Sequence, residues 1–237
     1  MKTRSMALDG SGPRGGIALL EDEIPLETIH FAEGPGFGVT LATQIEAILA
    51  RHQWRTATLD LLTVALGPGS FTGLRVALGL AKGISLVHSI PIVGISTLEL
   101  VAAATEPQHQ ELLSLRDAGN GLLFFALYHR QGKILTPRIT PTMGSLESLI
   151  SMLEPLVSHP TLFCCGPGLD TCRIRLEQHL GTRFRSPSTP HVPPSSDLLG
   201  RLGLALWRTG TFPPPLELEP LYLRPPQAVM TRKELIP

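Results

Sequence analysis

The chain has 237 residues, which is enough for one large domain or two small ones with a substantial hydrophobic core. Its composition, 43% hydrophobic and 17% charged residues, excludes a disordered protein, and 20 basic against 20 acidic residues leave no excess charge for holding RNA unaided. The N-terminus lacks the apolar core of a signal peptide and the longest apolar stretches are interrupted by Gly, Lys or Pro, so we expect a cytoplasmic protein without a membrane span.

The first half of the chain predicts an antiparallel meander of three strands, followed by alternating helices and strands. Glycine-rich and acidic turns separate the three strands, and apolar residues at helical spacing mark the first helix. Ser96 and Glu99 match the capping-box pattern at the start of a later helix. The predicted strands are residues 6–8, 16–20, 24–31, 59–66 and 91–95, and the predicted helices are residues 39–54, 70–87 and 96–104.

A polar break at residues 106–110 marks a domain boundary, and a similar order of elements follows it. The predicted strands are residues 111–116, 122–128, 133–137 and 161–165, and the predicted helices are residues 145–156, 169–180 and 196–208, the last capped by Ser196 or Asp197. This recurring order predicts two related α/β lobes, although no residue-level repeat is visible. We place the N-terminal lobe at 1–105, a smaller lobe at 106–194, a helix at 195–210 that packs back on the first lobe, and a Pro-rich extended tail at 211–237.

Three cysteines lie in the second lobe, at Cys164, Cys165 and Cys172. Their odd number and irregular spacing argue against a disulfide framework, and no zinc-ligand spacing is present. We therefore expect buried thiols in a reduced compartment.

Two glycine-rich turns are candidate phosphate or nucleotide sites. Residues 67–70 (GPGS) join a strand to a helix whose free backbone N–H groups favour an anion, but the Lys-Ser/Thr ending of a P-loop is absent. Residues 9–12 (DGSG) place an aspartate at a strand end, where it can contact a phosphate or its metal. A tight strand-to-helix turn and a capped β-turn are the structural alternatives. The candidate residues are Asp9, Ser11, Gly67, Gly69 and Ser70.

The helix at residues 70–87 is unusually rich in small residues. Glycine in a helix interior costs about 1 kcal/mol relative to alanine, and such a cost implies close packing against another helix of this chain or of a second subunit. The small residues are Gly73, Ala77, Gly79, Ala81 and Gly83.

Residues 67–99, read as GPGSFTGLRVALGLAKGISLVHSIPIVGISTLE, closely resemble the TsaB (YeaZ) family of the glycoprotease-like superfamily. Residues 117–128 and 221–225 resemble the second-lobe hairpin and the C-terminal signature of that family. The resemblance implies a two-lobed actin-like ATPase (ASKHA, RNase H-like) α/β fold. It also implies a role in making N6-threonylcarbamoyladenosine at position 37 of tRNAs that read ANN codons.

The resemblance further implies partners, namely a TsaD-type catalytic subunit and a TsaE-type ATPase, with tRNA met only indirectly. The resemblance implies no cofactor on this subunit. It implies that the assembly uses ATP and Mg²⁺, and a subunit interface is one candidate site for them. Two departures from the family are visible. Residues 9–12 replace the usual D-T-S-T, which weighs against a nucleotide in this lobe, and residues 32–36 (AEGPG) replace a His-Ser pair that opens an interface helix.

Catalytic chemistry is not expected in this chain. The His-x-x-x-His metal site of the related catalytic subunit falls on Thr97 and Val101, and neither side chain can supply the imidazole that such a site needs. Ser70 does not lie in a nucleophile elbow. A non-catalytic scaffold is therefore the leading hypothesis, and an ATPase or small-molecule kinase of the same fold, with Asp9 as its acid, is the alternative.

The two helices at residues 39–54 and 70–87 are the expected interface with the catalytic subunit. We expect that arginine in place of Ala77 or Leu80 abolishes pairing without unfolding the chain. A homodimer through the same helix face is a further possibility. The candidate contact residues are Gly73, Ala77, Leu80, Ala81 and Ile84, together with Leu41 and Ile45.

Overall fold

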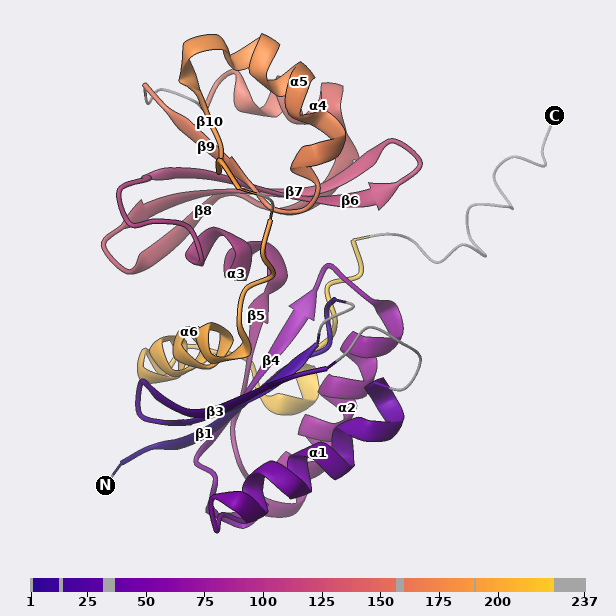
Figure 1. The fold of residues 1–237 in the computed structure, drawn as a ribbon, viewed down its shortest axis with the longest axis vertical. Helices are drawn as coiled ribbons and strands as arrows, with labels where there is room; N and C mark the ends of the chain where they lie inside the picture. Colours follow the sequence, from indigo (N-terminus) through magenta and orange to yellow (C-terminus); the bar gives the residue numbers. More distant parts are fainter. Residues whose placement is uncertain (1, 13–14, 32–36, 157–159, 190, 224–237) are drawn as a thin grey trace, which may run out of the picture. The chain divides into compact units, whose positions relative to one another are not determined.

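The computed structural model describes residues 2–12, 15–31, 37–156, 160–189 and 191–223, with backbone alone for residues 37–39. The chain divides into two compact units, which are described separately (Figure 1). Unit 1 comprises Met1–Ala104 and Val192–Pro220, and unit 2 comprises Thr105–His191 and Leu221–Pro237.

Unit 1 is built on a five-stranded mixed sheet of order β3-β2-β1-β4-β5. The first three strands run antiparallel, whereas β1, β4 and β5 run parallel. The strands are β1 (Arg4–Asp9), β2 (Gly16–Glu21), β3 (Ile24–His30), β4 (Leu61–Gly67) and β5 (Ile92–Ser96). The helices are α1 (Phe37–Arg51), α2 (Phe71–His88), α3 (Thr97–Ala103) and α6 (Ser196–Arg208), with short 3-10 turns η1 (Thr56–Thr58) and η3 (Pro215–Glu217).

The predicted meander and the strand–helix pairs of unit 1 are confirmed, with small differences at their ends. The predicted helix 39–54 ends at Arg51, because Gln53 takes a positive φ of 56° that a helix cannot continue. Trp54 then turns into the core, where it is 8% exposed. Ser96 caps α3 as predicted, and its side chain accepts a hydrogen bond from the Leu98 N–H.

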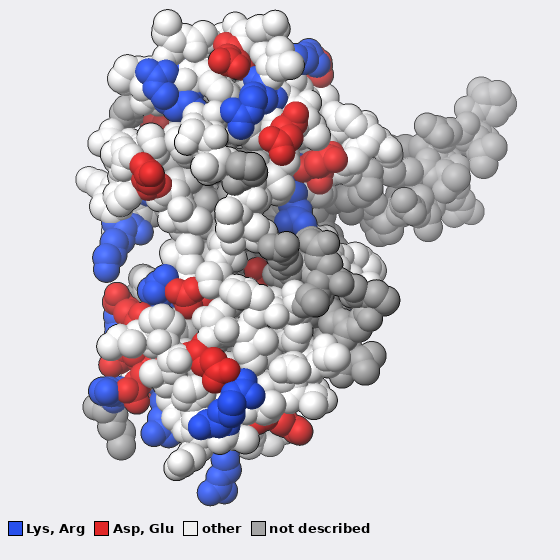
Figure 2. Space-filling model, in the orientation of Figure 1, with Lys and Arg blue, Asp and Glu red and all other residues white. Residues whose placement is uncertain are grey.

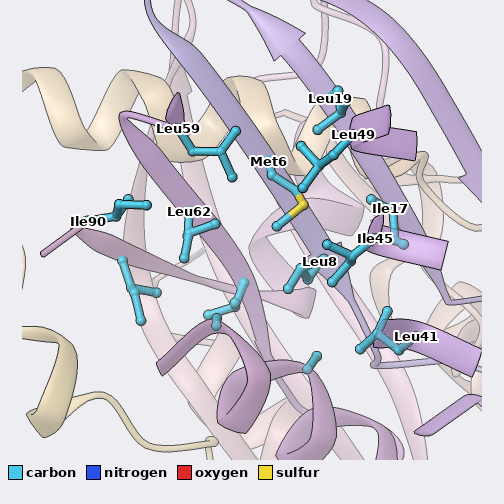
Figure 3. Close-up of a cluster of buried hydrophobic side chains, with 14 of the residues drawn as sticks. Met6, Leu8, Ile17, Leu19, Leu41, Ile45, Leu49, Leu59, Leu62 and Ile90 are labelled. Carbon is cyan, nitrogen blue, oxygen red and sulfur yellow. The ribbon is translucent and has the colours of Figure 1, made fainter. Parts of the chain in front are cut away.

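Both faces of the unit 1 sheet are covered, α1 and α2 lying on one side and α6 on the other (Figure 1). Alternation along β1 sends Met6 and Leu8 toward α1 and α2, and Ala7 toward α6. Figure 3 shows the first of these two cores, in which Leu41 and Ile45 of α1 lie over the strands. The sheet is thus a fixed platform for α2.

Unit 2 carries a second five-stranded mixed sheet, of order β10-β9-β6-β7-β8. Its helices pack on one core with the inward residues of β6, β7 and β9. The strands are β6 (Glu111–Gly119), β7 (Leu122–Gln131), β8 (Ile134–Ser145), β9 (Leu162–Cys165) and β10 (Phe184–Arg185). The helices are α4 (Leu146–Leu153) and α5 (Leu169–Leu180), with a 3-10 turn η2 (Gly181–Arg183).

The second half of the chain differs in three details from what the sequence predicted. The strand predicted to end at Pro137 continues to Ser145, because β8 is an edge strand, where proline costs no ladder hydrogen bond. The two-residue strand β10 is too short to carry a periodic signal and was not predicted. The N-cap of α6 is Ser195 rather than Ser196 or Asp197, and Asp197 instead pairs with Arg201 at 2.6 Å.

The two sheets share one topology, since β8-β7-β6-β9-β10 repeats the order β3-β2-β1-β4-β5. A residue-level repeat also exists, contrary to expectation. Gly67, Pro68 and Gly69 follow β4, and the same triplet, residues 166–168, follows β9. In both triplets the first glycine has a φ near +100°, which glycine adopts readily (102° at Gly67, 100° at Gly166). Among the described helices, none is long and apolar enough to cross a membrane.

The packing of α6 on the sheet allows a direct test. A Cβ atom on Gly203 would overlap the stiff, buried side chain of Thr63, whereas a Cβ atom on Gly79 of α2 would meet no described atom within 4 Å beyond the backbone of its own helix. We expect Gly203→Ala to lower the free energy of unfolding by about 1–3 kcal/mol, despite the better helix propensity of alanine. Gly79→Ala, the matched control, should raise it by up to about 1 kcal/mol. Equal urea midpoints for the two variants would contradict this packing.

The three cysteines are free and buried, as expected. Burial raises the pKa of Cys165 to about 12 and that of Cys172 to about 11, and it raises the pKa of Cys164 well above its ordinary value. Because the thiolate is the reactive form, we expect the native chain to resist a thiol-labelling reagent at pH 8, and all three thiols to react once it is denatured. Prompt labelling of the native chain would show that this core is open.

Candidate functional site

The two glycine-rich turns singled out in the sequence lie side by side in unit 1. One follows β1 and the other follows β4, and these strands are parallel neighbours. Turns that leave the carboxyl ends of adjacent parallel strands meet at one edge of the sheet, which is where open α/β sheets commonly bind ligands. The fold therefore brings together all five candidate phosphate-binding residues.

The two turns contact each other through their backbones. The Ser70 N–H donates to the Ser11 carbonyl oxygen at 2.8 Å. A Cβ atom on Gly69 would overlap the Ser11 carbonyl, and one on Gly73 would overlap the Gly10 carbonyl. Asp9 is 7% exposed, and its carboxylate accepts a hydrogen bond from the Ser11 N–H at 2.8 Å, as in an Asx turn. Glycine at positions 69 and 73 is thus needed for close approach within the chain.

This geometry favours the structural interpretation of both turns. At the N-terminus of α2, the Ser70 N–H is used by the Ser11 carbonyl, and the Gly73 N–H donates to the Ser70 side chain at 3.2 Å. The carbonyl oxygens of Gly10 and Ser11 lie against the first turn of the helix, and their partial negative charge opposes an anion there. Close packing at a strand–helix junction thus accounts for the glycines of these turns, and the phosphate site stays a prediction.

Thr97 completes this junction from the start of α3. Its hydroxyl donates to the Pro68 carbonyl at 2.5 Å, and the Ser96 hydroxyl donates to the Gly67 carbonyl at 3.3 Å. Thr97 and Val101, onto which the sequence resemblance maps the two metal-binding histidines, are 4% and 9% exposed. Among the described residues, no group of three or more His, Cys, Asp or Glu side chains is arranged to hold a metal ion.

The expected interface residues lie on α1 and α2, but most of them face the core rather than solvent. Most belong to the core of unit 1 and present almost no surface to a partner. The buried candidates are Gly73, Ala77 and Ala81 of α2, and Leu41 and Ile45 of α1. Leu80 and Ile84 are half-buried and pack against the same core. Because Ala77 is fully buried, Ala77→Arg should disrupt the fold and therefore does not test pairing by itself.

The exposed face of α2 is formed by a different set of residues. Gly79 and Gly83 lie one turn apart and open to solvent, about 200° around the helix from Ala77 and Ala81. The helix thus has two stripes of small residues, one packed on the sheet and one exposed. Leu86 and Val87 extend the exposed stripe and are 66% and 75% exposed.

Charge adds no second site on the face seen in Figure 2, where Lys and Arg are interspersed with Asp and Glu. Several cations are paired locally, such as Arg175 with Glu147 at 2.6 Å and Arg51 with Glu27 at 2.6 Å. Residues 32–36 and Arg224 and Pro225, which were singled out in the sequence, lie outside the described residues.

Comparisons with known proteins agree with this fold. Two Pseudomonas aeruginosa structures superpose on it, one titled an uncharacterized protein with similarity to peptidase YEAZ and the other YeaZ. The TM-scores are 0.75 and 0.72, each at 21% identity, covering 94% and 93% of this chain and 100% of each structure. The predicted two-lobed α/β fold class is confirmed.

Sequence comparisons identify the family. Residues 37–161 match the family model described as "TsaD: tRNA N6-adenosine threonylcarbamoyltransferase". The tRNA threonylcarbamoyladenosine biosynthesis protein TsaB of Bacillus subtilis is 30% identical over 195 residues, which cover 81% of this chain and 84% of the relative. The protein of the same name from Escherichia coli is 32% identical over 88 residues, covering 36% of this chain and 38% of the relative. The chain belongs to the TsaB (YeaZ) family of tRNA threonylcarbamoyladenosine biosynthesis proteins.

Proposed function

We propose that this chain is a non-catalytic subunit of the assembly that installs N6-threonylcarbamoyl on adenosine 37 of ANN-decoding tRNAs. In this role it binds and activates a TsaD-type catalytic subunit. Family membership supports the reaction, and the exposed stripe of α2 is the observation that supports the docking role. A TsaE-type ATPase in the same assembly, and ATP with Mg²⁺ used by the assembly, are part of this proposal.

The two exposed glycines lower the stability of α2, and no packing contact among the described residues offsets this loss. Gly79 and Gly83 are interior positions of an 18-residue helix, and each costs about 1 kcal/mol relative to alanine. Within the described residues, no atom outside the helix lies within 4 Å of a Cβ atom built on either glycine, so packing inside the chain does not require them. Small residues one turn apart let another helix approach closely, and we infer that a partner helix crosses α2 here.

The chemistry of the stripe fits a partner of apolar character. Leu86 and Val87 are largely exposed beside the two glycines. The exposed Arg75 lies one turn before Gly79, so the stripe is apolar toward the C-terminal end of α2 and basic toward its start. Large contiguous apolar patches on a protein surface mark contact sites, and we infer that these two side chains belong to one. The buried candidates hold this surface in place, because they fix α2 on the sheet and on α1. They are Leu41, Ile45, Ala77 and Ala81.

The lone-enzyme alternative gains no support from the site. An ATPase or kinase of this fold would use Asp9 as its acid, yet that carboxylate is engaged by the Ser11 N–H in a closed turn. Thr97, at one of the two metal-ligand positions of the catalytic relatives, is committed to the Pro68 carbonyl. A homodimer through the α2 stripe is compatible with docking, since one surface can serve either partner in turn.

Substitution of Gly83 tests the docking surface without placing a larger side chain in the core of unit 1. We expect Gly83→Arg to abolish co-purification with the TsaD-type subunit, because a long charged side chain then stands where a partner helix would cross. The thermal midpoint should stay the same or rise, since arginine is the better helix former.

Ala205→Arg is the matched control, because Ala205 is an exposed small residue of α6 in the same unit. It should leave pairing intact. If Gly83→Arg pairs like wild type, the proposed docking surface is wrong. If both variants lose pairing, the loss is due to the added charge and not to its position on the chain.

A further inference from the structure

The segment that follows α6 returns to α2 and packs beside it. Residues 215–217 form η3, which lies against α2 and is drawn in yellow in Figure 1. Leu218 is 4% exposed and belongs to the same core cluster as Ala77 and Ala81. Lys82 of α2 donates from its Nζ atom to the Leu216 carbonyl oxygen at 3.1 Å. The segment is therefore fixed to α2 at two points.

The side chain of Leu216 takes no part in this anchoring, which uses only its backbone carbonyl. Its side chain is 67% exposed, although Leu218, two residues along, is buried. Residues 213–215 are three consecutive prolines, which restrict the backbone just before it. A side chain displayed on a restricted backbone loses little entropy when a partner covers it. The chain thus presents a large apolar side chain at a fixed place, with no folding role evident for it.

Leu216 lies next to the exposed stripe of α2. Lys82 is three residues after Gly79 and four before Leu86, so it is a surface neighbour of both. Since Lys82 holds the Leu216 backbone, η3 stands at the edge of the open stripe. A helix packed on α2 at the usual interaxial distance of about 8–10 Å is about 10–12 Å wide, which is enough to reach this edge.

We propose that the docking surface is composite, with Leu216 as a second contact for the same TsaD-type catalytic subunit that covers Gly79 and Gly83. Lys82 is a positioning residue, which holds η3 where Leu216 can be covered. This inference rests on the proposed function, and continuity of the two surfaces is the reason for assigning them one partner.

The test compares two exposed side chains of unit 1. Leu216→Asp should weaken pairing of the full chain with its TsaD-type subunit on the order of tenfold or more, the loss expected when a buried leucine contact is replaced by a charge. Ile24→Asp, at a 65% exposed position on β3, is the control and should stay within about twofold of wild type. Both variants should keep the wild-type thermal midpoint, because neither side chain is buried.

Lys82→Met provides the second measurement. It should weaken pairing less than Leu216→Asp, and the double variant should bind no more weakly than Leu216→Asp alone, since Lys82 acts through Leu216. If Leu216→Asp pairs like wild type while Gly83→Arg does not, this inference is overturned and the proposed function stands. If both variants pair like wild type, the inference and the proposed docking surface are overturned together.

Discussion

The position of α2 depends on one close contact, the approach of the Gly10 and Ser11 backbone to the first turn of that helix. Glycine at positions 69 and 73 makes room for the two carbonyl groups, and the Ser70 N–H bonds to one of them. Thr97 fixes the same turn from the other side through the Pro68 carbonyl. With its start held there and Ala77 and Ala81 packed on the core, the helix has one rotational setting, and that setting decides which residues it exposes.

This contact has two consequences for function. The edge of the sheet where a ligand would enter is occupied by the chain's own backbone, and its polar groups are largely paired with one another. The outward side of α2 meanwhile carries Gly79 and Gly83, for which the described part of the chain offers no packing reason. A surface built at a cost in helix stability, beside a closed turn, suits a subunit that acts by binding. The η3 segment adds Leu216 to that surface while burying only Leu218.

Much of this fold could be predicted from the sequence, because most elements carry a strong local signal. The apolar run before Gly67, the glycine turn and the helix after it predicted the β4–α2 unit, and Ser96 predicted the start of α3. The close contact itself was not predictable, since it joins residues nearly 60 positions apart whose pairing depends on strand order. Glycine at position 69 looked like a phosphate-binding residue for the same reason that it admits a carbonyl, namely the missing Cβ atom.

The exposed residues of α2 could not be identified from the sequence alone. Ala77 and Ala81 repeat at the same spacing as Gly79 and Gly83, so composition alone could not tell the inner stripe from the outer one. Only the neighbours in space separate them, with the alanines against the core and the glycines against solvent. The edge position of β8, which tolerates Pro137, likewise became visible only with the sheet order.

Family membership and the exposed stripe of α2 together support a role in forming threonylcarbamoyladenosine in tRNA through a partner subunit. The most direct measurement is mass spectrometry of tRNA nucleosides after the protein is depleted from its own cells. The account predicts that N6-threonylcarbamoyladenosine falls while other modified nucleosides persist, and that re-expression of the wild-type chain restores it. An unchanged level of this nucleoside after complete depletion would contradict the account.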